Sequence, residues 1–440
     1  MPRTRVTAVV LALGLVATGV AASTLHATNA VSESSNDFTA NAESTALYCT
    51  GLGAGVGGHV DFTNLTGEPR HLSVEVVANT GAHAARSVAL AAHATIDISP
   101  AAWVPGSLYG VSALVSGGGV VGAQVGAQNT AVAPCSDGGV TDWYAAGFDT
   151  LVGSSALVSL FNPSATPAVV NVTTVTSSGF SAPAPFQGLA VGPHAEVAVN
   201  LATQIVDTAN VGVHVNVVRG TVVAVGVQTS ATTASFNVGQ DVLATKAVFP
   251  LVTTAANTRA QVRVANPNDV AASVTVAVAL GSFHIAPESV EVPAYASGVV
   301  TITPNSAIPE AGFAALTLIS SVPVATALAV GEKGLGLSAP GPLSRTWLVT
   351  DFSGRGFARA VLTNASTHAV NIHATDLATS ASFSATLAAG TSSDLRALLP
   401  GLRQLQGLTL LITSDRLVRM TTILPVTPVG PVVASALNGG

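Results

Sequence analysis

The chain has 440 residues, of which 48% are hydrophobic and 9% are charged, and its formal net charge is −6. No basic cluster stands out, so the sequence carries no electrostatic footprint for nucleic acid. Beyond the amino terminus, no run reaches the roughly 18 uninterrupted apolar residues that a membrane-spanning helix requires. The hydrophobicity is therefore spread over short strands.

The amino terminus predicts export. Two arginines among the first five residues precede an uncharged apolar stretch from Val6 to Ala22, which ends in small residues that suit cleavage. Extended to Leu25, this stretch reaches about 20 residues, so an uncleaved single-pass anchor fits equally well. We assign residues 1–27 to a signal peptide or transmembrane anchor and residues 28–44 to a flexible tether. The rest is expected outside the cell or in its envelope.

An asparagine that ends an alternating apolar run recurs four times, at Asn64, Asn162, Asn266 and Asn364. A short turn rich in Pro, Ser, Thr or Gly follows each one, and then another alternating run, which indicates a repeated strand, turn and strand. We interpret these asparagines as structural turn formers. Their side chains can bond the backbone two residues on and tolerate the conformations that turns demand.

The fold class predicted from these runs is all-β. About seven short strands fall in each hundred residues, and strands such as Arg259 to Ala265 alternate polar and apolar residues, as a sheet with one buried face requires. This density is typical of antiparallel sandwiches. We therefore predict four tandem immunoglobulin/fibronectin III-like β-sandwich repeats of about 100 residues. A β-propeller is the main rival, but its blades usually repeat every ~40 to 50 residues, so each period would need two unlike blades.

The predicted sandwiches cover residues 45–135, 140–232, 244–335 and 343–440, which we call the first to fourth segments. The linkers between them are short, and those containing Pro and Gly favour a semi-rigid string of domains over freely jointed ones.

The two cysteines, Cys49 and Cys135, lie at opposite ends of the first segment. In an exported chain such a pair predicts a disulfide. Closing a loop of this size would stabilise the fold by roughly 4 to 5 kcal/mol in the chain-entropy model. The alternative, free or metal-bound thiolates, fits less well because structural zinc sites usually show paired ligands at short spacing.

No pattern predicts a catalytic residue, a metal or a cofactor, so we expect no enzyme. Residues 53–58 match G-x-G-x-x-G, but a dinucleotide fingerprint needs a helix there, and a strand begins at His59 instead. The first segment's histidines show no metal-ligand spacing. Isolated glutamates of the third segment fall at predicted strand ends and loops, namely Glu288, Glu291, Glu310 and Glu332.

Three short motifs stand out: Tyr48-Cys49-Thr50-Gly51, Leu160-Phe161-Asn162-Pro163 and Val264-Ala265-Asn266-Pro267. With the amino-terminal segment and a body rich in alanine and valine but poor in lysine, they make the chain similar to an actinobacterial family. The proteins of that family are exported or membrane-anchored, have no assigned function and are built from immunoglobulin-like β repeats. The resemblance implies an envelope or cell-surface location and transfers no catalytic residue.

The function expected from the sequence is that of a non-enzymatic cell-surface or secreted envelope protein acting as a structural or interaction module. The alternative is a carbohydrate-binding accessory protein linked to envelope glycans, which needs an exposed aromatic platform such as Trp103. An enzyme with a site between two segments is a third class. The expected partners are envelope proteins or glycans, with no nucleic acid, and with the membrane only through an uncleaved amino-terminal segment.

Overall fold

The computed structural model of the chain describes residues 44–53, 55–127, 131–230, 234–253, 259–280, 283–302, 312–331, 336–338, 343–349, 359–404, 408–423 and 435–436. The predicted signal or anchor, and all but the last residue of the predicted tether, lie outside these residues. Of the helices in the described part of the chain, none has both the length and the apolar character needed to cross a membrane.

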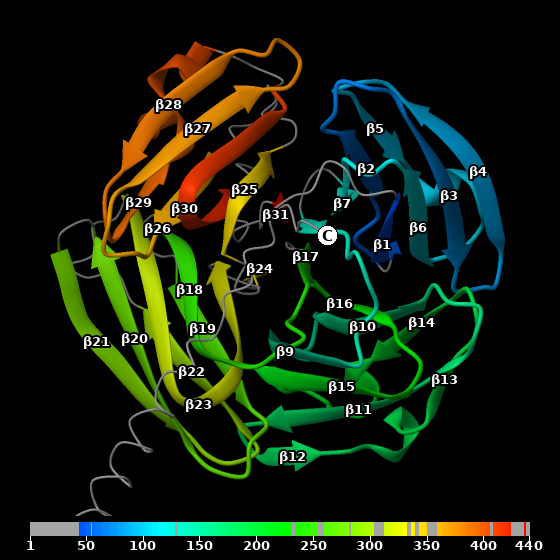
Figure 1. Cartoon of the computed structure of the whole chain (residues 1–440). Coiled ribbons are helices and arrows are strands. Elements are labelled where there is room, and N and C mark those ends of the chain that lie inside the picture. Colours follow the sequence, from blue (N-terminus) through cyan, green and yellow to red (C-terminus); the bar gives the residue numbers. More distant parts are fainter. Residues whose placement is uncertain are drawn as a thin grey trace, which may run out of the picture. The chain divides into compact units, whose positions relative to one another are not determined.

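The first segment forms two four-stranded sheets, with strand orders β1-β6-β3-β4 and β5-β2-β7-β8 (Figure 1). The elements are β1 (Ser44–Gly53), β2 (His59–Asn64), β3 (Arg70–Ala78), β4 (His83–Leu90), β5 (Thr95–Ile98), η1 (Pro100–Ala102), β6 (Leu108–Ser116), β7 (Val120–Val125) and β8 (Val132–Pro134).

The second segment and the linker after it form a five-stranded and a four-stranded sheet. The first has the order β12-β11-β15-β9, with β13 paired to β11, and the second has the order β14-β10-β16-β17. The elements are β9 (Asp142–Phe148), β10 (Ser155–Asn162), β11 (Ala168–Thr176), β12 (Gly179–Ser181), η3 (Ala184–Phe186), β13 (Leu189–Val191), β14 (Ala195–Asn200), η4 (Leu201–Thr203), β15 (Val211–Arg219), β16 (Val223–Thr229) and β17 (Ala234–Asn237).

The third segment forms one seven-stranded sheet along the order β21-β20-β23-β19-β22, with β18 and β24 also paired to β23. The long strand β23 pairs with β18 and β20 through its first part and with β19 and β24 through its second part. The elements are β18 (Ala244–Thr253), β19 (Arg259–Asn266), β20 (Ala272–Leu280), β21 (Phe283–Val292), β22 (Ala296–Ile302), β23 (Gly312–Gly331) and β24 (Gly336–Ser338).

The fourth segment also forms a seven-stranded sheet, along the order β28-β27-β30-β25-β31, with β26 paired to β29 and β30. The elements are β25 (Ser344–Val349), β26 (Arg359–Asn364), β27 (Val370–Asp376), β28 (Ser382–Leu387), β29 (Thr391–Asp394), α2 (Leu395–Leu398), η5 (Pro400–Gln404), β30 (Leu410–Ile423) and β31 (Ser435–Ala436).

Apolar packing continues across the segment boundaries. Val225 and Val227 of β16 belong to the core that fills the first segment. Ala325 and Ala327 of β23 belong to the core of the second segment. Because each core is completed by side chains from the next segment, these segments do not bury their apolar surface independently.

The first and fourth segments also contact each other, although they lie at opposite ends of the described chain. Leu65, beside β2, forms a buried apolar cluster with Leu348 of β25 and with Leu377, which follows β27. Val121 and Leu411 pack against the same cluster. Contacts therefore run from each segment to the next at the first two boundaries and from the last segment back to the first.

The prediction of four tandem immunoglobulin/fibronectin III-like β-sandwiches is wrong. The six sheets form the blades of a six-bladed β-propeller, with unequal blades of four to seven strands. Both architectures bury one face of each antiparallel strand and connect the strands by short turns, so they produce the same alternating sequence pattern. The pattern cannot show that a sheet packs against the next segment. The rival interpretation, a β-propeller, gives the correct architecture. The two unlike blades that it requires in each period occur in the first and second segments, whereas the third and fourth segments form one sheet each.

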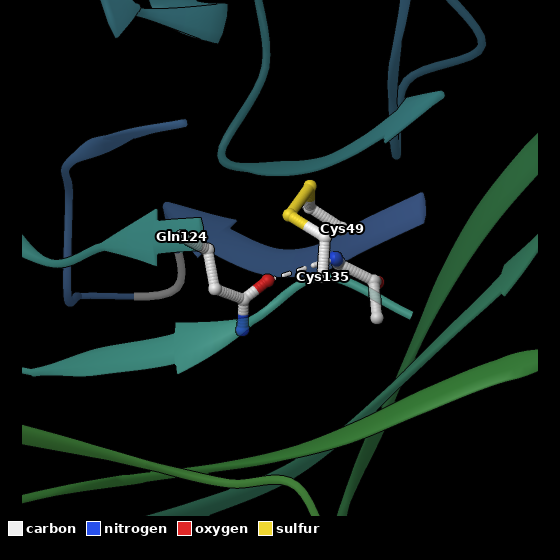
Figure 2. Close-up of a disulfide and its surroundings, with 4 residues drawn as sticks. Cys49, Gln124 and Cys135 are labelled. Carbon is white, nitrogen blue, oxygen red and sulfur yellow. Dashed lines mark hydrogen bonds between the residues drawn. A yellow bond between two sulfur atoms is a disulfide. The ribbon is translucent and has the colours of Figure 1, made fainter. Parts of the chain in front are cut away.

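The predicted disulfide is confirmed. Cys49 of β1 and Cys135, which follows β8, are bonded, with their Cα atoms 4.6 Å apart. Figure 2 shows the bond beside Gln124 of β7, whose side-chain oxygen accepts a hydrogen bond from the backbone N–H of Thr50 at 3.1 Å. The disulfide thus ties the first strand of the chain to the end of its first segment.

The four recurring asparagines occupy the same local structure, each fully buried at the end of a strand. In the second segment, Asn162 Nδ2 lies 2.8, 3.1 and 3.0 Å from the carbonyl oxygens of Thr166, Val191 and Gly192. Asn162 Oδ1 accepts from the backbone N–H and the hydroxyl of Ser164. Equivalent contacts surround the other three asparagines. One amide therefore joins a turn to the hairpin that follows it.

Replacing Asn162 by Asp should lower the free energy of unfolding by about 3 kcal/mol, because buried carbonyls then face an acceptor instead of a donor. The measurement is urea denaturation at pH 7. Asn200→Asp is the matched control: Asn200 is exposed and its side chain accepts from the N–H of Ala202, a capping role that Asp fills equally well. Equal stability of the two variants would contradict this account of the buried asparagines.

Candidate functional site

A buried carboxyl group lies at the junction of the first and second segments. Glu196 of β14 is 4% exposed, and its two carboxyl oxygens lie 2.8 Å from the hydroxyl of Thr50 in β1. The hydroxyl of Ser159 in β10 donates to the same carboxyl group. A Cβ on Gly110 would stand 2.8 Å from Glu196 Oε2, so the glycine makes room for the carboxyl group.

Burial raises the pKa of Glu196 to about 7, and the hydrogen bonds from Ser159 and Thr50 lower it only in part. A carboxyl group with such a pKa is found both in active sites and in structural networks. Here the complete burial leaves no surface for a substrate, and both neighbouring hydroxyls are engaged with the carboxyl group. We therefore assign Glu196 to the junction itself. Nearby, His194 Nδ1 and Glu75 Oε2, 3.1 Å apart, connect the same two segments.

An ion pair occupies the junction of the second and third segments. Arg263 of β19 donates from Nη1 to the carbonyl oxygen of Gly147 at 2.6 Å and to Asp149 Oδ1 at 2.8 Å. Asp149 Oδ1 also accepts from the backbone N–H of Asn210 at 3.0 Å. The side chain of Arg263 is only 5% exposed. Its charge is thus compensated inside the protein, as a buried cation requires.

A small pocket lies at the junction of the same two segments. Its lining includes Tyr144, Thr174, Phe180 and His214 of the second segment and Ala265 and Pro267 of the third. Strands β9, β11, β12 and β15 position the first group, and β19 and the turn after it supply the second. The pocket exists only because the two segments pack together.

One wall of the pocket is a stacked pair of rings. The rings of Tyr144 and His214 have centroids 4.2 Å apart and an interplanar angle of 8°. His214 Nε2 lies 2.9 Å from Asp142 Oδ1, which also accepts from Asn216 Nδ2 at 3.1 Å. In the neutral imidazole, Nε2 donates to the carboxylate and Nδ1 is left as an acceptor.

The ionisation states of this wall follow from the same contacts. Burial raises the pKa of Asp142, but the hydrogen bonds from His214 and Asn216 outweigh that effect, so the pKa lies below its ordinary value. Burial, followed by the charge of Asp142, raises the pKa of Tyr144. At neutral pH the wall therefore presents a protonated phenol beside an imidazole that an ionised carboxylate orients.

Phe180, which lines the pocket, meets a second exposed aromatic side chain, that of Tyr295. Phe180 of β12 is 55% exposed and Tyr295, in the turn before β22, is 43% exposed. Their rings meet edge to face with centroids 6.0 Å apart. Thr174 also lines the pocket. It is 1% exposed, and its hydroxyl oxygen has no hydrogen-bond partner among the described residues.

The profile of a family of unknown function, DUF5719, matches residues 128–398, more than half of the chain. The chain belongs to this family. The matched region includes the whole pocket and both of its segments. No curated protein matches the chain.

Among solved structures, the chain is similar to a tetra-tandem repeat in the extending region of a large adhesion protein. The identity is 12%, the match covers 92% of this chain and 98% of that chain, and the TM-score is 0.12. At that TM-score the similarity supports no conclusion about fold or function.

Of the residues singled out from the sequence, Ala265 and Pro267 of the motif Val264-Ala265-Asn266-Pro267 line the pocket. The four asparagines and the disulfide hold strands together, Gly53 ends β1, and residues 55–58 lie before β2, where a strand begins. In the described part of the chain, no group of three His, Cys, Asp or Glu side chains could hold a metal ion. Glu288 and Glu291 lie on β21, whereas Glu310 and Glu332 lie outside the described residues.

None of the three tryptophans forms the open platform that the carbohydrate alternative needs. Trp143 and Trp347 are buried, and the guanidinium of Arg86 lies 4.4 Å above the centre of the half-buried Trp103 ring. Among the described residues, Phe180 and Tyr295 are the large aromatic side chains found exposed. A sequence signal that could have pointed to Tyr295 is its place in a repeated turn, because the other segments carry histidine or glycine there.

Replacing Glu196 by Gln should remove a pH dependence of stability. The carboxyl is protonated in both the folded and unfolded states below about pH 4.5. Between that pH and about 7 only the unfolded state ionises freely, so the free energy of unfolding of the native protein falls as the pH rises. The fall amounts to about 3 kcal/mol and is complete above pH 7. Denaturation from pH 4 to 8 should show Glu196→Gln gaining stability relative to the native protein across this range.

Glu68→Gln is the matched control, because Glu68 is an exposed glutamate of the first segment. Its stability should run parallel to that of the native protein at every pH. If the free energies of unfolding of the native protein and of Glu196→Gln differed by the same amount at every pH, Glu196 would not titrate in this range.

Proposed function

We propose that this protein is an exported, non-enzymatic component of the cell envelope that acts as a structural and interaction module. The observation that carries this proposal is the use of its buried ionisable groups at segment junctions. Glu196 is enclosed between the first and second segments, and Asp149 is paired with Arg263 between the second and third. Groups with the burial and pairing of catalytic residues thus serve to hold the sheets together.

The disulfide supports the export part of the proposal. Disulfides persist in oxidising compartments and are rare where thiols are kept reduced. Cys49 and Cys135 close a loop that spans the first segment. The apolar amino-terminal stretch, with two arginines before it, suits a signal peptide or an anchor. The partners of such a module are envelope proteins or glycans, and the pocket at the second junction favours the glycan alternative.

Two measurements on cells that produce the full chain test this function. Protease added to intact cells should degrade the protein while a cytoplasmic protein survives, and its cysteines should resist alkylation until a reductant is added. The purified protein should then bind the isolated cell envelope saturably, and Glu196→Gln should bind equally well. A protease-protected chain with reduced cysteines would refute export, and absence of saturable binding would refute the interaction role.

A further inference from the structure

We propose that the pocket between the second and third segments binds a neutral sugar ring, with the apolar face of the sugar against Phe180 and Tyr295 and its hydroxyl groups bonded to the polar lining. This inference rests on the proposed function, because it names the ligand class of an envelope interaction module. Four observations carry it: the exposed rings, the backbone of Tyr295, the unpaired hydroxyl of Thr174, and the absence of charge in the lining.

Phe180 of the pocket lining and Tyr295 beside it meet edge to face across the junction. Phe180 comes from the second segment and Tyr295 from the third, and their rings are in contact although both remain about half exposed. Aromatic rings exposed beside a pocket mark binding surfaces more often than isolated apolar residues do. The C–H face of a sugar ring packs well on such rings, while its hydroxyl groups stay available for hydrogen bonds.

The backbone shows that the turn itself does not need this tyrosine. Tyr295 has a φ of 53°, a left-handed conformation that bulky side chains rarely adopt. The equivalent turn of the fourth segment carries Gly390, with a φ of 63°. In both turns the backbone N–H bonds the residue two positions after the recurring asparagine, at Asn268 and Ser366. Histidine takes the same conformation in the equivalent turns of the first and second segments, at His93 and His194. The turn therefore does not fix the identity of the side chain, and at this position the tyrosine ring lies against Phe180 of the pocket lining.

The lining offers both donors and acceptors. The hydroxyl of Thr174 is buried without a partner among the described residues, which is costly unless a ligand or water satisfies it. The phenol of Tyr144 can both donate and accept, and because Nε2 of His214 faces Asp142, Nδ1 is the ring nitrogen left for a ligand. A sugar hydroxyl donates and accepts, so it complements each of these groups.

Charge selects the class of sugar. Among the residues that the structure describes, the lining contains no Lys, Arg, Asp or Glu side chain. The carboxylate of Asp142 accepts hydrogen bonds from Asn216 and from His214, which lines the pocket. An anionic sugar or a phosphate would find no cation here and would be repelled by Asp142. A neutral ring is therefore favoured over an acidic one.

The test is saturation-transfer NMR on the exported full-length protein with D-glucose, D-galactose, D-mannose and L-arabinose, each at millimolar concentration. At least one sugar should receive saturation from the protein. Tyr295→Gly should weaken its affinity about fivefold or more, the loss expected when a stacking ring is removed. Its thermal stability should be kept or raised, because glycine adopts a positive φ freely.

His93→Gly is the matched control. His93 occupies the equivalent turn of the first segment, with a φ of 54°, far along the chain from the pocket. This variant should relieve the same strain and leave the sugar affinity unchanged. Thr174→Val, which removes the unpaired hydroxyl at nearly constant shape, should weaken binding without loss of stability.

Two results would overturn the proposal: no saturation transfer to any of the four sugars, or unchanged affinity in both Tyr295→Gly and Thr174→Val. The envelope-binding assay separates this failure from failure of the proposed function. Saturable envelope binding without sugar binding would leave the interaction role standing and reject only the ligand class. Absence of both would reject the function as well.

Discussion

The buried amide of one asparagine in each segment is the contact on which the repeated local structure depends. Each Nδ2 donates to carbonyl oxygens that belong to the turn after the strand and to the end of the following hairpin. Each Oδ1 accepts from the residue two positions on. Buried backbone groups need such partners, and only a side chain with both donors and an acceptor supplies them from one position.

Packing between segments then converts four similar units into one body. Alternating side chains leave each sheet with an apolar face, and alanines and valines of the next segment cover part of it. Small side chains permit this close approach. A Cβ on Gly212 would clash with the Cβ of Ala265, so one of the two strands would have to shift. Buried polar groups at two junctions also fix the relative orientation of the sheets. Glu196 and Arg263 can make their hydrogen bonds across the junctions in only one relative position of the sheets.

The sequence was sufficient for features that depend on local chemistry. Alternating runs such as Arg259 to Ala265 predict strands because only one face of a sheet is buried. The four asparagines were recognisable from their spacing, and the disulfide from the pair of cysteines in a chain predicted to be exported. The arrangement of the sheets could not be predicted from the sequence. A period-two pattern shows that one face of a strand is buried but does not show what covers that face. The contact of Leu65 with Leu348 joins opposite ends of the described chain and leaves no local pattern.

The pocket was equally out of reach of sequence reasoning. Nothing in the spacing of Tyr144 and Tyr295 along the chain indicates that their segments meet. His214 and Asp142 come together through pairing of β9 with β15, which requires the sheet to be known. Residues that act across a junction become recognisable once the sheets are placed. The one sequence signal from these residues is a departure from the repeat: Tyr295 stands in a turn that carries glycine in the fourth segment.

The contacts between segments indicate that they fold as one closed body rather than as separate domains. Differential scanning calorimetry of the native protein and of Asn364→Asp, in which the substitution lies in the fourth segment, distinguishes these two possibilities. A single body predicts one cooperative transition that shifts as a whole to lower temperature in the variant. Several transitions, of which only one shifts, would contradict the account and indicate independent domains.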